Sequence, residues 1–257
     1  MSARSHRFNA IMWAFIALTI ALLYLPLIPP MLFSVGAAGA DERELSFAAY
    51  GQIWSNPVLM QALRTTLVTG AIVGAVTPLL GLLAAMAVRE LASRRLVLML
   101  ILLPLFVPGV SMGLADAFFF RELGLQASLA TIAIVQALWA LPFATLVILT
   151  VMAGFDPIYL EAAYMTGANR LRAFLDVELP LIRSGILGAA SFSLILSFNE
   201  TIRTSVVQGP FNTVQTYIWS TYKQVGLSPA LYALMSLLIV LTLLIVVVLL
   251  AVARARA

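Results

Sequence analysis

Six long apolar runs are the feature of this sequence that most restricts its fold. A helix needs about 20 mainly apolar residues to cross the hydrocarbon core of a bilayer, which is roughly 30 Å thick. Runs of this length lie at about residues 11–33, 62–87, 97–118, 128–151, 184–203 and 230–252. The fifth run is the weakest, because Asn199 and Glu200 lie near its end. The runs predict an all-α membrane protein with six transmembrane helices.

The composition agrees with this interpretation and indicates one membrane domain. Of the 257 residues, 62% are hydrophobic and 10% are charged, which is typical of a membrane protein rather than of a soluble core. The first run is too long for a removable signal peptide, and no clear small-residue cleavage site follows it. We therefore expect a single transmembrane domain over residues 1–257, with a polar loop at about 152–183 between the fourth and fifth spans.

Basic residues predict the orientation, because loops on the cytoplasmic side of a membrane are enriched in Lys and Arg. With the amino terminus inside, the basic residues on the cytoplasmic side are Arg4, Arg7, Arg89, Arg94, Arg95, Arg170, Arg172, Arg183, Arg254 and Arg256. Those outside are Arg43, Arg64, Arg121, Arg203 and Lys223. The opposite topology would invert this bias, so we expect both termini to be cytoplasmic. Cytoplasmic arginines account for the net charge of +4, so no nucleic-acid partner is expected.

The scarcity of reactive side chains excludes several classes of function. The chain has no Cys, which rules out disulfides, thiol nucleophiles and Cys-based metal sites. Its single His, His6, lies in the basic amino-terminal tail, so no Ser–His or metal–His site can form in the predicted bundle. No Gly-rich phosphate loop of the Walker type is present. We expect no catalytic residue, metal site or cofactor in this chain, and any ATP that powers it is hydrolysed by another chain.

The polar loop between the fourth and fifth runs contains a short predicted helix. Asp156-Pro157 is a turn signal at its start. Glu161 falls in the first turns of the helix, where a carboxylate suits the positive end of the helix dipole. Leu179-Pro180 is expected to break this helix and start the next segment. A polar helix held at the membrane surface between two spans is suited to contact a partner in the cytoplasm.

The spacing of this loop resembles the signature of the membrane subunits of binding-protein-dependent ABC importers. That signature is Glu-Ala-Ala, three residues, Gly, nine residues, Ile, one residue and Leu-Pro. The residues at these positions are Glu161, Ala162, Ala163, Gly167, Val177, Leu179 and Pro180. Val177 is the one departure, and it keeps a β-branched apolar side chain. The resemblance implies a type I importer permease fold, in which all of these residues but Val177 belong to the coupling element that docks on an ATPase subunit.

The same resemblance implies the partners of the chain. They are two ATPase subunits that carry ATP and Mg, a second permease subunit that is either non-identical, as the length of this chain favours, or a second copy of it, and an extracytoplasmic substrate-binding protein. The chain itself would be a multi-pass protein of the bacterial inner membrane, surrounded by lipid. The alternative is a self-contained secondary transporter or channel, which would need coupling ions bound at the midplane and inverted repeats. No convincing repeat is found, and the acidic residues are few and off-centre.

Three polar residues within the runs are candidates to line a translocation pathway, because charge inside a membrane is expensive and usually functional. They are Asp116, late in the third run, and Asn199 and Glu200, at the end of the fifth. Arg203 lies three positions after Glu200 and could pair with it on one helical face. The sequence leaves open whether Glu200 contacts the solute or only pairs with Arg203.

A narrower resemblance concerns the segment that follows the fifth run. Ser197-Phe198-Asn199-Glu200, Gly209-Pro210, Thr213 and Tyr217 resemble the corresponding part of spermidine/putrescine permeases, in which both positions after Ser-Phe are usually acidic. Asn199 departs from that pattern and removes one negative charge. The resemblance implies import of a small polar solute, with a polyamine, an opine or a related amine as the leading candidates.

Prolines and glycines indicate special packing in two of the runs. Pro104 and Pro108 interrupt the third run, where a lost backbone hydrogen bond can mark either a cavity or a simple packed kink. Gly70 and Gly74 share one face of the second run, where small side chains allow helices to approach closely. We expect this face of the second run to serve packing rather than function.

Overall fold

The computed structural model of the chain describes residues 3–36 and 45–255, and every regular element within these residues is a helix. This confirms the predicted all-α architecture. The chain divides into two compact units, Met1–Met60 with Thr221–Val240, and Gln61–Ser220 with Leu241–Ala257. Helices α4, α12 and α13 contribute residues to both units.

The first unit contains the amino-terminal helices. They are α1 (Ala3–Tyr24), a 3-10 turn (Leu25–Leu27), α2 (Ile28–Ser34) and α3 (Ala48–Ser55). The Ser34 hydroxyl lies 2.9 Å from the Tyr50 hydroxyl, which ties α2 to α3. The rings of Phe33 and Tyr232 lie 5.0 Å apart, and the Ser236 hydroxyl donates to the Pro30 carbonyl at 3.3 Å. These contacts pack α2 against the first part of α13.

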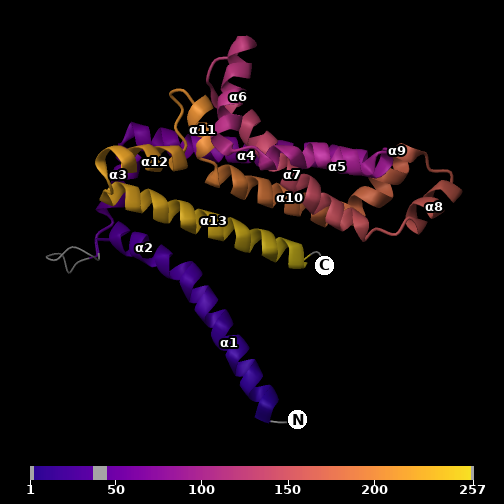
Figure 1. The fold of residues 1–257 in the computed structure, drawn as a ribbon, viewed down its shortest axis with the longest axis horizontal. Coiled ribbons are helices and arrows are strands. Elements are labelled where there is room, and N and C mark those ends of the chain that lie inside the picture. Colours follow the sequence, from indigo (N-terminus) through magenta and orange to yellow (C-terminus); the bar gives the residue numbers. More distant parts are fainter. Residues whose placement is uncertain (1–2, 37–44, 256–257) are drawn as a thin grey trace. The chain divides into compact units, whose positions relative to one another are not determined.

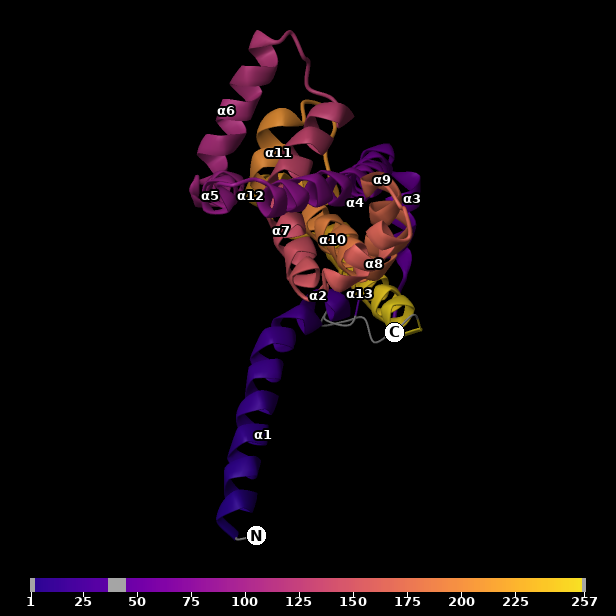
Figure 2. The same cartoon turned by 90° about the vertical axis from the view of Figure 1, so that its right-hand side faces the viewer.

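The second unit holds most of the bundle (Figure 1). Its helices and those shared with the first unit are α4 (Pro57–Glu90), α5 (Arg94–Leu102), a 3-10 turn (Leu103–Phe106), α6 (Gly109–Glu122), α7 (Leu129–Ala153), α8 (Ile158–Met165), α9 (Arg170–Ala173), a π turn (Phe174–Glu178), α10 (Leu179–Asn199), α11 (Ile202–Val207), α12 (Val214–Val225) and α13 (Pro229–Ala255). Helices α7 and α10 lie side by side, and α8 and α9 lie together beyond their ends (Figures 1 and 2).

Within residues 3–36 and 45–255, five stretches are long and apolar enough to cross a membrane. They are Ile11–Ser34, Pro57–Glu90, Leu129–Ala153, Arg170–Asn199 and Pro229–Val248. A sixth crossing is reached only if Arg94–Phe106 and Gly109–Glu122, which meet at an angle of 102°, count as one broken span.

The third apolar run is therefore not the single straight helix that its length suggests. Pro108 has extended backbone angles, φ −55° and ψ 134°, so α6 starts in a new direction (Figure 2). Proline also restricts the residue before it, and Val107 is extended as well. Gly109 and Gly113 let α6 approach Arg203 closely, since an added Cβ would lie 3.5 Å and 3.0 Å from it. The bend thus directs α6 onto α11.

Helices α4, α7 and α10 share the main core of the second unit. Its buried side chains are Leu82, Ala85, Ala144, Ile148, Met152, Ile182 and Ala189. Glycines allow the close approach that the sequence predicted for α4. A Cβ on Gly74 would lie 3.3 Å from Leu194 of α10, and one on Gly81 would lie 3.0 Å from the Ala144 side chain and 3.2 Å from backbone atoms of α7.

Replacing Gly81 by Ala is expected to lower the melting temperature of the purified protein. The added methyl group meets the α7 backbone, which cannot move aside as a flexible side chain could, and overpacking of this kind costs about 1–3 kcal/mol. Gly188→Ala is the matched control, because its Cβ would make an ordinary 3.4 Å contact with Val147 and it gains the same helix propensity. Equal melting temperatures for the two variants would contradict this account of the packing.

Candidate functional site

The predicted docking helix is present as α8, in the part of the chain that we call the coupling segment, residues 156–180. The Asp156 carboxylate accepts a hydrogen bond from the Ile158 amide at 3.0 Å, which satisfies a free N–H at the helix start. Glu161 lies in the first turn and is exposed. Its charge is therefore favoured by the helix dipole and remains available to a partner.

Gly167 ends this helix. The Gly167 amide donates to the Tyr164 carbonyl at 3.0 Å, and the Ala168 amide donates to the Ala163 carbonyl at 3.1 Å. This pair of bonds is the Schellman motif, which requires a left-handed residue after the last turn. Gly167 supplies it with φ 87°. A Cβ at Gly167 would meet nothing within 4 Å, so the glycine is needed for its backbone angle and not for internal space.

The coupling segment exposes several large apolar side chains beside its charged ones. Met165 is 88% exposed, and Ile158 and Leu171 are also well exposed. Glu161 and Ala162 lie on the same short helix and are exposed, while Ala163 is half-buried. Exposed apolar side chains on the same short helix as an exposed carboxylate are features of a protein-docking surface.

The second half of the coupling segment differs from expectation, because no break occurs at Leu179-Pro180. Asn169 caps α9 by accepting from the Arg172 amide at 2.9 Å, and one apolar helix then runs from Arg170 to Asn199. A π turn at Phe174–Glu178 precedes Pro180. In a regular α-helix the proline ring would meet the carbonyl of Asp176, and the wider π turn removes that conflict.

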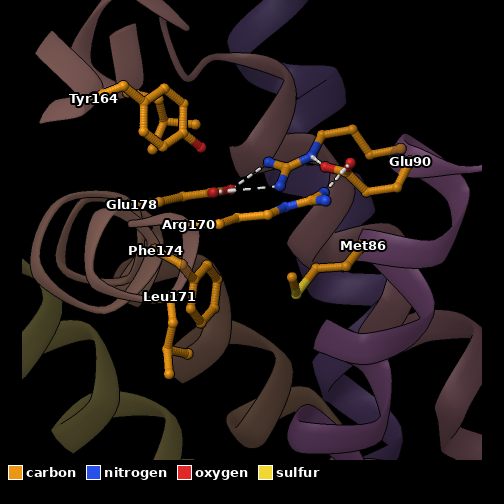
Figure 3. Close-up of a pocket in the computed structure, with 9 residues that line it drawn as sticks. Met86, Glu90, Tyr164, Arg170, Leu171, Phe174 and Glu178 are labelled. Carbon is orange, nitrogen blue, oxygen red and sulfur yellow. Dashed lines mark hydrogen bonds and ion pairs between the residues drawn. The ribbon is translucent and has the colours of Figure 1, made fainter. Parts of the chain in front are cut away.

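Paired charges connect the coupling segment to the end of α4 (Figure 3). Both amino groups of the Arg89 guanidinium donate to Glu178, through Nη1 to Oε1 and through Nη2 to Oε2 at 3.2 Å. Arg89 Nε also donates to Glu90 at 3.2 Å, and Glu90 accepts from Arg170. Four alternating charges thus join two residues of α4 to one residue of the π turn and one of α9.

A pocket of about 660 Å³ lies beside these pairs. Its lining combines the four charged residues with apolar and aromatic ones, namely Met86, Leu160, Tyr164, Leu171 and Phe174. Figure 3 shows Glu178, Glu90 and Arg170 directed toward the centre of this group, with Tyr164 and Phe174 at its border. The pocket lies between α8 and the end of α4, and the ion pairs at its edge join α4 to α9 and to the π turn, not to α8.

The candidate pathway residues lie at the other end of α10. Helix α10 stops at Asn199, and Glu200 has extended angles, φ −78° and ψ 119°. The Glu200 carboxylate accepts from the Arg203 amide at 2.8 Å and from its guanidinium at 3.0 Å. Both residues are buried, at 6% and 7% exposure. The ion pair considered from the sequence is therefore present, although it spans the junction of α10 and α11 and not one helical face.

Arg203 brings Asp116 into the same neighbourhood. Asp116, Trp139 and Arg203 line one small cavity of about 10 Å³, and the Arg203 Cζ lies 3.7 Å from the centroid of the Trp139 ring. Asn199 is placed differently, since it is exposed and its amide donates to the Ile195 carbonyl of its own helix at 2.9 Å. Of the three candidates, Asp116 and Glu200 are thus connected through Arg203, and Asn199 is not.

A buried polar chain continues from this site into the bundle. The Ser197 hydroxyl donates to Gln136 Oε1 at 2.6 Å, and Gln136 Nε2 donates to the Thr204 hydroxyl at 2.9 Å. The three residues come from α10, α7 and α11, so the polar bonds fix the relative positions of these helices around the Glu200–Arg203 pair. Buried polar groups of this kind are costly unless each finds a partner.

Several residues of these two sites, among them the four below, escaped the sequence reasoning as site members. Arg89 and Glu178 bond across 89 positions of sequence, and no local pattern links them. Glu178 did carry a signal, because it is a carboxylate directly before the apolar Leu179-Pro180. Gln136 and Trp139 lie three apart in the fourth apolar run, where polar or bulky aromatic side chains are worth noting. In residues 3–36 and 45–255, no group of three His, Cys, Asp or Glu side chains is placed to hold a metal ion.

Comparison with known proteins relates these features to transport systems. The model of the family described as "Binding-protein-dependent transport system inner membrane component" matches residues 77–256. The spermidine/putrescine transport system permease protein PotC of Escherichia coli K12 is 26% identical over 227 residues, covering 86% of each chain. The sulfate transport system permease protein CysT of Salmonella typhimurium is 26% identical over 199 residues, covering 72% of this chain and 71% of CysT.

Solved structures share the fold. A bacterial ABC transporter involved in the import of the acidic polysaccharide alginate has a chain that matches with a TM-score of 0.73 at 18% identity, covering 99% of this chain and 98% of its own. The MetNI methionine ABC transporter in an inward-facing conformation matches with a TM-score of 0.65 at 18% identity, covering 80% and 98%. At these identities the likeness establishes the fold alone.

Proposed function

This chain belongs to the family of inner membrane components of binding-protein-dependent transport systems, and from that premise we propose that it couples ATP hydrolysis on partner subunits to the passage of a small polar solute. It is a permease subunit and not an enzyme, because its family consists of transport components and its named relatives are permeases. Its own contribution is mechanical: movement of the docked ATPases displaces the coupling segment, and the helices switch access from one side of the membrane to the other.

The observation that carries this proposal is the form of α8. It is a capped helix of eight residues, closed by Gly167, with an exposed apolar surface around Glu161. Such a helix presents its exposed surface for docking, and the ion pair of Arg89 with Glu178 ties the π turn that follows it to α4. The roles of Glu161, Ala162, Ala163, Gly167, Leu179 and Pro180 in coupling are part of the proposal.

The remaining parts of the transporter follow from this role. We propose two ATPase subunits with bound ATP and Mg, a second permease subunit related by a pseudo-twofold axis, and an external substrate-binding protein. The orientation that places α8 against the ATPases has both termini on the cytoplasmic side, in agreement with the distribution of arginines. All of residues 1–257 would then act as one permease domain.

The solute is proposed to be a polyamine, an opine or a related amine. PotC and the putrescine permease PotI, both of Escherichia coli K12, carry polyamines in their names, which supports a cationic solute, whereas CysT carries sulfate in its name. Asp116 and Glu200 supply two negative charges near one positive charge, Arg203. Glu200 is paired with Arg203, so Asp116 is the carboxylate better placed to attract an amine. Asn199, exposed at the end of α10, is proposed as a polar contact.

Replacing Glu161 by Lys is expected to weaken association with the ATPase subunits. Reversal of a charge on a small docking surface creates like-charge or unpaired contacts, which cost more than the loss of one peripheral pair. The measurement is recovery of the ATPase when this chain is purified from membranes that contain the whole complex. Glu122→Lys on α6 is the matched control, because it reverses the charge of another exposed carboxylate. Equal ATPase recovery for both variants and the wild type would count against a docking role for α8.

A further inference from the structure

The contact between Arg89 and Glu178 has the geometry of a strong link. Two parallel N–H groups meet two carboxylate oxygens, an arrangement that fixes direction as well as distance. Glu178 is 2% exposed, so water cannot solvate its carboxylate in place of a lost arginine. A buried carboxylate that loses its arginine is strongly destabilised, and the pair is therefore expected to stay closed.

The second pair of the network is of a different kind. The side chains of Arg170 and Glu90 are 77% and 42% exposed, and exposed ion pairs contribute little and open readily. The two pairs thus join the same elements, the end of α4 and the coupling segment, with unequal strength. Arg89–Glu178 is the one able to transmit a displacement.

The local structure explains why the link forms at this position. The π turn ends at Glu178 and turns its side chain inward, while Phe174 and Leu179 of the same stretch pack against the core of α4, α7 and α10. Arg89 lies in the last turn of α4, where a cation is favoured by the helix dipole. The carboxylate on the coupling segment and the guanidinium on α4 are thus each held by their own element.

We propose that Arg89 and Glu178 are positioning residues that make the end of α4 follow the coupling segment when the ATPases move it. Helix α4 packs tightly on α7 and α10 through Gly74 and Gly81, so a displacement of its end is passed to the bundle core. Without the link, α8 would still bind the ATPase, but its movement would reach α4 only through the packing of Phe174 and Leu179 on the core and not at the end of the helix. This inference rests on the proposed function.

The test separates the link from a role in folding. We would purify the complex of this chain with its ATPase, second permease and binding protein, and measure ATP hydrolysis with and without the binding protein. In Arg89→Leu/Glu178→Leu, an apolar pair replaces the buried charges and is expected to preserve the fold and ATPase recovery. Its stimulation by the binding protein is expected to fall about 5- to 150-fold, the range of ordinary coupling between sites. Glu90→Gln/Arg170→Gln, which removes the exposed pair, is the control and should remain stimulated.

A covalent cross-link in place of the Arg89–Glu178 ion pair provides a second test. The chain has no Cys, so Arg89→Cys/Glu178→Cys places two unique thiols in it, which a bifunctional methanethiosulfonate can bridge. Stimulation is expected to be low before bridging and restored after it, with the reagent tested on the wild-type complex to account for cysteines of other subunits. If the pair served only the stability of the fold, the double-cysteine variant would not both fold and bind the ATPase before bridging and regain stimulation after it.

The outcomes distinguish the two levels of the proposal. If the wild-type complex shows no stimulation by the binding protein, the proposed function itself is wrong. If the wild type is stimulated and the Leu pair is stimulated equally, the link is not needed and the inference is overturned. It is also overturned if bridging the two cysteines leaves an uncoupled complex uncoupled.

Discussion

Replacing Gly167 by Asp is expected to abolish solute uptake while the chain still inserts and accumulates normally. Gly167 has φ 87°, an angle that costs an ordinary L-residue roughly 1–2 kcal/mol. The change also places a negative side chain where α8 turns, in the surface proposed to dock on the ATPase. Because nothing lies within 4 Å of the added Cβ in this chain, the defect should arise in docking and in the shape of the turn, and not in the core.

The measurements are uptake in cells, the amount of chain in the membrane, and stimulated ATP hydrolysis by the purified complex. Gly124→Asp is a closely matched control, because Gly124 has φ 72° in the turn after α6 and its added Cβ would also meet nothing within 4 Å. It carries the same backbone penalty away from the coupling segment. Normal transport by the Gly167 variant, or equal loss in both variants, would remove α8 from the coupling role.

Removing the charge of Arg203 is expected to have the largest effect on stability. Arg203→Gln leaves the Glu200 carboxylate buried without its counterion, which costs about 3–5 kcal/mol, and loses the stacking of the guanidinium on Trp139. The melting temperature of the purified protein should fall sharply. Asp116→Asn is the control, since Asp116 makes no hydrogen bond or ion pair within the described residues, and its melting temperature should stay near that of the wild type.

The double variant then separates pairing from a role in transport. If Glu200 serves only Arg203, then Glu200→Gln and Arg203→Gln should cause similar losses of stability and uptake, and Glu200→Gln/Arg203→Gln should be no worse than either. If Glu200 also lines the pathway, uptake by Glu200→Gln should fall further than its stability and its ATPase docking explain. The first pattern would remove Glu200 from the pathway and leave Asp116 as the candidate there.

The features that the sequence predicted depend on local patterns. Apolar runs predicted the helices because a bilayer span needs a fixed length, and five of them form candidate spans. The helix that begins after Asp156-Pro157 was also predicted, since turn residues act within a few positions. The shared face of Gly70 and Gly74 was predictable because the spacing of residues along a helix is also a local pattern. Both glycines pack against α10, where added Cβ atoms would meet Phe198 and Leu194.

The features that were not predictable depend on which segments meet. The partner of Glu178 lies 89 positions away, so nothing near it identifies Arg89. Pro108 and Pro180 show the same limit for the backbone: one coincides with a bend of 102°, and the other lies within a continuous helix. The difference comes from the surroundings, because α6 gains its packing on α11 only after a bend, whereas the π turn accommodates Pro180 without one.

That π turn also lets the helix carry an extra residue without changing the direction of α8. A turn of this type holds one residue more than a regular turn, whereas a residue added to a regular α-helix rotates everything beyond it by about 100°. Deleting one residue from Phe174–Glu178 would therefore give a plain α-helix with nearly unrotated flanks, but the ring of Pro180 would then meet a carbonyl of the preceding turn. The same deletion farther along α10 has no wide turn to absorb it and would rotate α9 and α8 about the α10 axis. The π turn is thus the place where this helix can change in length and keep the face that it offers to a partner.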